Sequence, residues 1–218
     1  IQITVPKSYV IAATGELQNE EEIRWLKEKP HPADIIHREP AAIKKQVTHG
    51  KKPLPYKGKP IVKPPVTPET PLTGKELKTL SYIQNNVHDF AWFANKEFIV
   101  NYDTLKLASG KVIDAYSFYT PTRKEVWKNS IQFIKDAVRT RSSWLGEYPY
   151  SIVSAVEAKM GFDGGMEYPT ITSMSPMTSA MDLDHTIEHE VGKNGKYGIR
   201  ERKEREHTRG EEGKKTDL

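Results

Sequence analysis

The sequence contains no cysteine, and this absence removes three kinds of chemistry at once. Disulfide bonds, cysteine-ligated zinc and a thiol nucleophile are all excluded. Long apolar runs are also missing. No stretch approaches the roughly 18 consecutive apolar residues of a membrane-spanning helix, so we expect no membrane span. Residues 1–5 lack the charged leader of a signal peptide, and we therefore expect none here.

A strong charge of one sign is absent as well. The 33 basic and 29 acidic residues leave a net charge of +4, and the excess is spread along the 218 residues. Proteins that bind nucleic acids usually gather such charge on one face or one helix, so we expect no nucleic-acid partner. The length allows one large domain or two small ones, with room for a sizeable core.

Two segments have too few apolar residues for a packed core. Ten of the 15 prolines lie in residues 30–71, which we predict to be a surface excursion without regular structure. Residues 200–218 hold 13 charged side chains and one apolar one, Leu218. We predict that this charged tail is poorly packed.

The rest of the chain alternates between strand-like and helix-like patterns. Strands are predicted at residues 1–5, 9–13, 80–83, 98–100, 112–119, 151–156 and 168–172. Helices are predicted at residues 20–29 and 122–146, and around the apolar stripe of Leu183, Ile187 and Val191. Thr122 begins a capping-box pattern. The aromatic cluster of Phe90, Trp92 and Phe93 is predicted to plug the core.

One helix carries a pattern that is close to a zinc motif. In H-E-x-x-H helices two histidines one turn apart bind zinc, and the glutamate acts as general base. Here His189 and Glu190 fit, but Lys193 stands at the second histidine position. The same segment also spells H-x-x-E-H, the inverted order. That alternative would place a metal on His185 and His189 with Glu188 as base, completed by His207 or Glu212.

Four stretches together resemble the zinc aminopeptidases of the membrane alanyl aminopeptidase type, which are gluzincin metallopeptidases, and in particular their bacterial members. They are YVIAATGEL (9–17), NVHDFAWF (86–93), GFDGGMEYPTIT (161–172) and TIEHEVG (186–192). The resemblance implies an α+β fold in two parts. Residues 1–100 would be the end of an antiparallel β-domain, and residues 101–218 the first, sheet-bearing half of a thermolysin-like catalytic domain.

The resemblance also implies an activity, the zinc-dependent removal of N-terminal residues from peptides with a free N-terminus. By position, His189 matches the first zinc ligand and Glu190 the general base. Glu212 matches the third zinc ligand, and Glu167 the carboxylate that holds the α-amine of the substrate. The loop whose backbone lies along the substrate is matched by Gly164, Gly165 and Met166.

Lys193 departs from this pattern at the position of the second zinc histidine. A protonated lysine is a cation without a lone pair, so it repels Zn²⁺. We therefore expect weak or absent zinc binding and impaired activity. The family's apolar residues are replaced by glycine or a basic residue at Gly195, Lys196 and Arg200, which suggests a truncated, surface-altered fragment. We expect the parent protein to be exported or periplasmic. The alternative is a non-catalytic peptide-binding or structural module that kept the fold and lost the metal.

Overall fold

The computed structural model describes residues 1–28 and 77–195. The predictions for the proline-rich segment 30–71 and the charged tail 200–218, and the assignment of Glu212, fall outside these ranges. In the described part no helix is both long enough and apolar enough to cross a membrane.

The N-terminal region forms two small antiparallel sheets and one helix. The first sheet has the strand order β1-β4-β3 and the second pairs β2 with β5. Their strands are β1 (Gln2–Pro6), β2 (Val10–Ala13), β3 (Glu16–Leu17), β4 (Leu77–Ile83) and β5 (Trp92–Asn95). Helix α1 (Glu20–Glu28) follows β3, and its three leading glutamates suit the positive end of the helix dipole. The predicted strands and helix of this region are confirmed.

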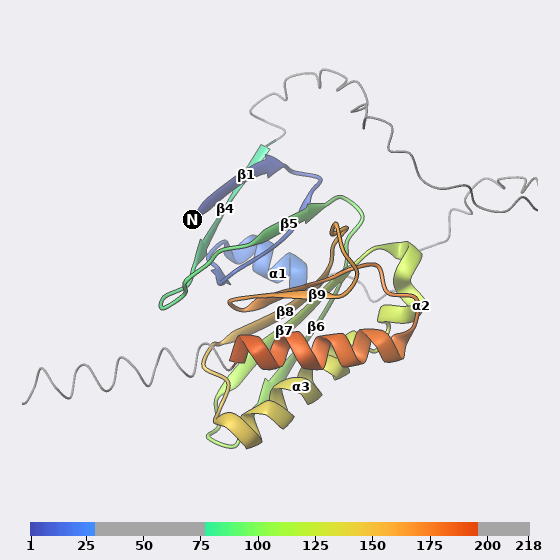
Figure 1. Cartoon of the computed structure of the whole chain (residues 1–218). Helices are drawn as coiled ribbons and strands as arrows, with labels where there is room; N and C mark the ends of the chain where they lie inside the picture. The colour runs from blue at the N-terminus through green and yellow to red at the C-terminus, as the bar shows by residue number, and fades with distance from the viewer. Residues whose placement is uncertain (29–76, 196–218) are drawn as a thin grey trace, which may run out of the picture.

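A five-stranded sheet forms the centre of the molecule, in the order β6-β7-β8-β10-β9 (Figure 1). Its strands are β6 (Ile99–Lys106), β7 (Val112–Tyr119), β8 (Ile152–Glu157), β9 (Gly165–Tyr168) and β10 (Ile171–Met174). Strand β8 runs parallel to both β7 and β10, whereas the β6–β7 and β10–β9 pairs are antiparallel. With the small antiparallel sheets, this makes the chain α+β, as predicted. The division into domains at residue 100 stays a prediction.

Strand β9 lies at the edge of this sheet, and a tight reversal joins it to its antiparallel neighbour β10. The single strand predicted at residues 168–172 is wrong. Pro169 cannot donate a backbone hydrogen bond, and Thr170 has a positive φ of 66°, so the chain reverses there. The turn ends β9 at Tyr168 and starts β10 at Ile171.

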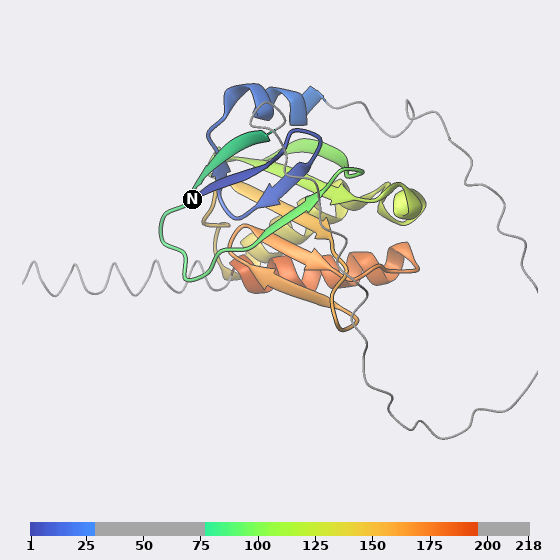
Figure 2. The same ribbon diagram turned by 90° about the horizontal axis from the view of Figure 1, so that it is seen from above.

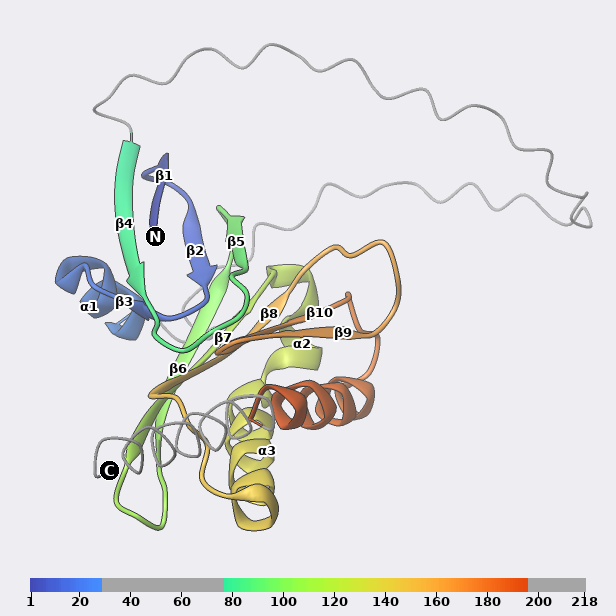
Figure 3. The same cartoon turned by 60° about the vertical axis from the view of Figure 1, so that its left-hand side comes forward.

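Two helices cover one face of the sheet, and α1 and the small sheets cover the other (Figures 2 and 3). The first face packs against α3 (Ser130–Leu145) and the helix formed by residues 180–195. Along β7, Ile113 and Ala115 belong to this core, whereas Tyr116 and Phe118 belong to the core on the α1 face. This alternation is the period of a strand buried on both sides.

The predicted helix 122–146 is interrupted. It consists of a 3-10 turn, η3 (Pro121–Arg123), a short α2 (Lys124–Trp127) and then α3. The predicted capping box is wrong, because the Thr122 hydroxyl pairs with the Thr120 hydroxyl at 2.9 Å and caps no helix. The prediction that Phe90, Trp92 and Phe93 plug the core is wrong for Trp92. This side chain is 49 % exposed and lies on β5 of the two-stranded sheet.

Candidate functional site

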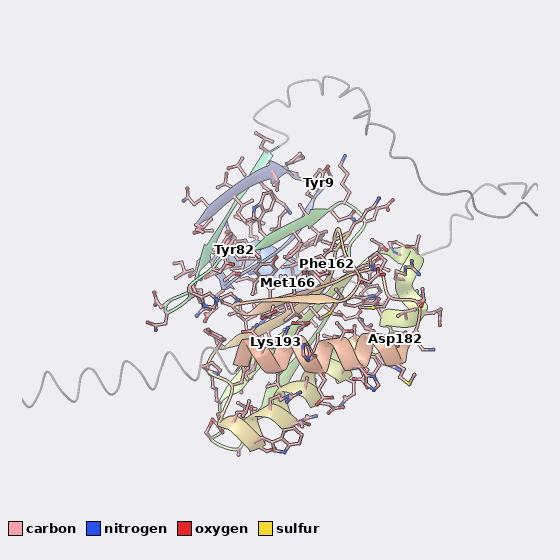
Figure 4. The ribbon with its side chains drawn as sticks, in the orientation of Figure 1. Tyr9, Tyr82, Phe162, Met166, Asp182 and Lys193 are labelled. Atoms are coloured by element: carbon pink, nitrogen blue, oxygen red, sulfur yellow. The ribbon has the colours of Figure 1, made fainter. Side chains whose placement is uncertain are left out.

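Edge strand β9 lies directly against the helix 180–195, because Gly165 has no side chain. A Cβ placed on Gly165 would lie 2.5 Å from Cγ of Glu190 and 2.9 Å from Cγ2 of Thr186. Real Cβ atoms do not approach other atoms so closely, so only glycine allows this contact. Figure 4 shows the consequence: Lys193 on the helix lies beside the strand that carries Met166.

Asn194 fastens the same helix to the β9–β10 turn. Its amide nitrogen donates to the Tyr168 carbonyl at 2.7 Å, and its amide oxygen accepts from the Thr170 backbone N–H at 3.2 Å. Asn194 is 3 % exposed, so these bonds satisfy a buried side chain. Sequence reasoning missed this residue. Its position could have been recognised from the helical spacing. Asn194 follows Val191 by three residues and therefore lies on the same buried face of the helix as Leu183 and Ile187.

Three charged side chains meet between strand and helix. The Lys193 ammonium lies 3.1 Å from Oε2 of Glu190 and 3.4 Å from Oε2 of Glu167. The Glu190 side chain is 5 % exposed and that of Glu167 20 %, so both carboxylates are largely withdrawn from water. One ammonium thus compensates two neighbouring acids, and we call this group the Glu167–Lys193–Glu190 cluster.

The pKa values of the cluster reflect this arrangement. Burial raises the pKa of Glu190 above its ordinary value, and the nearby Glu167 adds to the effect while Lys193 opposes it. Burial also acts to raise the pKa of Glu167, but hydrogen bonds from its own backbone N–H and from Glu190, together with the charge of Lys193, outweigh it and the pKa is lowered. Burial acts to lower the pKa of Lys193, and the two carboxylates overcome it and raise the pKa. Lys193 is therefore a cation at neutral pH.

The residues do not fit a zinc ion. The Lys193 ammonium lies where the resemblance requires a second histidine, and an ammonium has no lone pair to give a metal. The His189 side chain is 64 % exposed, with Nε2 at 3.9 Å from Oε1 of Glu190. Nowhere in residues 1–28 and 77–195 do three histidine or carboxylate side chains form a group that could hold a metal. Glu212, the assigned third ligand, lies outside these ranges.

In the described part of the inverted motif, the predicted base points toward another partner. Oε1 of Glu188 lies 3.4 Å from the Arg141 guanidinium on α3, so this carboxylate is turned to a cation on the neighbouring helix. A base for metal-bound water would instead have to face the metal between His185 and His189. His207 and Glu212, one of which would complete this site, lie outside the described residues, so the alternative stays a prediction.

The remaining predicted site residues lie on or before β9. Gly164 has a φ of 120°, which favours glycine, and its N–H donates to the Ser175 hydroxyl at 3.0 Å. The Ser175 N–H donates in return to the Gly164 carbonyl at 2.8 Å, which fixes the start of the strand. Met166 is 36 % exposed on the strand. The structure thus brings Glu167, Gly165 and Glu190 together and leaves His189 on the surface.

Solved structures share this fold. An M1 zinc metallopeptidase from Deinococcus radiodurans matches with a TM-score of 0.50 and 16% identity, over 87% of this chain and 32% of that one. Aminopeptidase A from Legionella pneumophila, solved with aspartic acid, matches with a TM-score of 0.52 and 10% identity, over 87% of this chain and 18% of that one. No family model and no curated protein matches the sequence. At these identities the likeness shows the fold, and this chain spans about a third or less of either structure.

Proposed function

We propose that this chain is a peptide-binding module with the fold of a zinc aminopeptidase that does not hydrolyse the peptide. The observation that carries the proposal is the position of the Lys193 ammonium, 3.1 Å from Glu190 and 3.4 Å from Glu167. The two carboxylates to which the resemblance gives the catalytic and amine-binding roles are both in contact with a cation of the chain itself.

Binding would use the edge of the sheet. A peptide can add to an edge strand by main-chain hydrogen bonds, and β9 is such a strand. Glu167 on β9 would accept the free α-ammonium of the peptide. Lys193 lies closer to Glu190 than to Glu167, so an incoming ammonium can share Glu167 while Lys193 stays on Glu190.

Hydrolysis is disfavoured by the same cation. A general base needs a carboxylate with a free lone pair beside the attacking water. Here Glu190 is held by Lys193, and its neighbour Glu167 leaves it closer to the protonated state. No described residue offers a metal site that would activate water.

Calorimetric titration of a tripeptide tests the binding half. We expect a peptide with a free N-terminus to bind at least about tenfold tighter than its N-acetylated form, because acetylation removes the ammonium that Glu167 accepts. Glu167→Gln should remove this preference. Glu97→Gln, which changes an exposed acid in the turn between β5 and β6, is the control and should keep the preference. Equal affinity for the two peptides would overturn the proposed role of Glu167.

Metal analysis tests the second part of the proposal, that the chain does not hydrolyse peptides. It also tests a second candidate function. The likeness in fold favours that second candidate, a zinc aminopeptidase. Stoichiometric zinc together with turnover of aminoacyl chromogenic substrates by the unaltered chain would establish it and overturn our proposal. We expect neither. Lys193→His should increase zinc binding measurably, because it replaces the repelling cation by a ligand. If this variant stays as metal-free as Lys193→Gln, Lys193 is not what excludes the metal.

A further inference from the structure

A cavity of about 210 Å³ lies on the opposite face of the five-stranded sheet from Lys193. Its apolar walls come from strand β2, helix α1 and strands β7 and β8. They include Ile11, Leu26, Tyr116, Phe118 and Ile152. For scale, an apolar cavity of about 150 Å³ in another protein holds a benzene molecule. A single aromatic ring with a short side chain therefore fits, and the proposed peptide site makes no use of this space.

The mouth of the cavity is charged. Among the lining residues, Glu16, Lys27 and Asp114 carry the charges, and Glu16 and Lys27 are exposed to solvent. Tyr82, labelled in Figure 4, also lines the cavity. A closed packing defect would be lined by apolar groups alone, whereas ligand sites combine apolar walls with a few polar groups.

The mouth already accommodates one ammonium group. Lys27 Nζ lies 3.0 Å from a carboxylate oxygen of Asp114 and 4.7 Å from the centre of the Tyr102 ring. The Tyr102 hydroxyl donates to the other carboxylate oxygen at 2.8 Å. A cation thus lies between an acid and an aromatic face, so the local chemistry favours a ligand with a positive charge.

Among the described residues, no cation of this kind pairs with the second acid, Glu16. Within the described ranges, Glu16 accepts a hydrogen bond from the neutral Ser151 hydroxyl. The mouth therefore carries two carboxylates against one ammonium. Burial raises the pKa of both Tyr82 and Tyr116, and the negative charges of Glu22 and Asp114 respectively raise it further.

We infer that this cavity binds a small arylalkylamine-type molecule, with its ring between β2 and β7 and its ammonium group at Glu16. The apolar walls fix the body of the ligand, and the unneutralised carboxylate fixes its charged end. The inference rests on a different face of the sheet from the proposed peptide site, so each can fail without the other.

Ligand-observed NMR with three probes of nearly equal size tests the inference on the full chain. They are 2-phenylethylammonium, neutral 2-phenylethanol and anionic 3-phenylpropionate. We expect the ammonium to bind about tenfold tighter than the alcohol, and the anion to bind weakest. Equal binding of all three, tighter binding of the anion, or no binding of the ammonium up to millimolar concentration would overturn the inference.

Two variants locate the site. Ala12→Leu adds side-chain volume at the cavity wall and should abolish binding of the ammonium and the alcohol alike. Glu16→Gln keeps the acceptor for Ser151 and should remove the preference for the ammonium while the alcohol still binds. Glu21→Gln, on α1 but away from the cavity lining, should change neither. If Ala12→Leu does not fold, the Glu16→Gln result decides: a retained tenfold preference overturns the inference.

Discussion

The two faces of the five-stranded sheet differ in how their acidic side chains are compensated. On the helix face, the buried Glu190 and the half-buried Glu167 are compensated by Lys193 from the same chain. The α1 face borders a cavity, and among the described residues the Glu16 carboxylate at its mouth accepts only from the neutral Ser151 hydroxyl. On the helix face a ligand must share the acids with a cation of the chain itself, whereas on the α1 face the Glu16 carboxylate faces solvent.

Truncation of one core residue on each face measures this difference most strongly. Ile187→Ala on the helix face should lower the free energy of unfolding by about 4 kcal/mol, because a fully buried side chain leaves a new cavity. Leu26→Ala should cost about 2 kcal/mol, because Leu26 borders space that is already empty. Urea unfolding of both variants gives the two values. Equal losses would mean that the cavity is filled in solution.

Removal of the cation leaves the two helix-face acids without compensation. Lys193→Met should cost about 2 kcal/mol at pH 7, since Glu167 and Glu190 then face each other without compensation. Lys128→Met, which breaks an exposed pair with Glu125, is the control and should cost at most about 0.5 kcal/mol. Added methylammonium should restore part of the lost stability of Lys193→Met and should have no such effect on Lys128→Met. A chain that is unaffected by the substitution would show that the cluster contributes nothing.

Filling the contact between strand and helix tests how closely that face is packed. Gly165→Ala should cost about 1.5 kcal/mol, because its Cβ would lie 2.5 Å from Glu190 and force that side chain aside. Gly161→Ala is the matched control, with nothing within 4 Å of its Cβ, and should change stability by less than about 0.5 kcal/mol. Thermal unfolding distinguishes them, and a harmless Gly165→Ala would show that β9 and the helix lie further apart.

The smallest expected effect is a gain in stability, from the substitution Glu190→Gln. Folding raises the pKa of Glu190 above its usual 4.5, so the folded chain binds this proton more tightly and the ionised form costs stability at neutral pH. Glu190→Gln should therefore be slightly more stable than the unaltered chain at pH 7. The advantage should shrink as the pH falls toward 4.5, where the native glutamate takes up its proton. A pH-independent difference would contradict the raised pKa.

Local patterns predicted the elements of this fold well. The stripe of Leu183, Ile187 and Val191 marked the helix 180–195, and all three are buried. The strand segments followed from alternation or from short apolar runs, and the α+β class followed from the resemblance. These features depend on neighbours along the chain, which a periodic pattern records.

The contacts that define the site could not be predicted in this way. Lys193 and Glu167 are 26 positions apart, and their pairing depends on the turn at Thr170 and the bare backbone of Gly165. Position alone indicated that Lys193 would repel a metal, but not that it would hold the two carboxylates. The cavity could not be predicted from the sequence. Its volume depends on how side chains from distant segments pack between α1 and the sheet, and no local pattern records this packing.

The central place of β4 in the first small sheet has a consequence for the order of folding. Strands β1 and β3 each pair with β4 and not with each other, so Gln2 meets Ser81 and Leu17 meets Tyr82. Neither strand has a partner until the chain beyond residue 77 has been made and has returned. Contacts between such distant segments form slowly. We expect this sheet to assemble after the β6–β7 hairpin and to be the first part to open in hydrogen exchange.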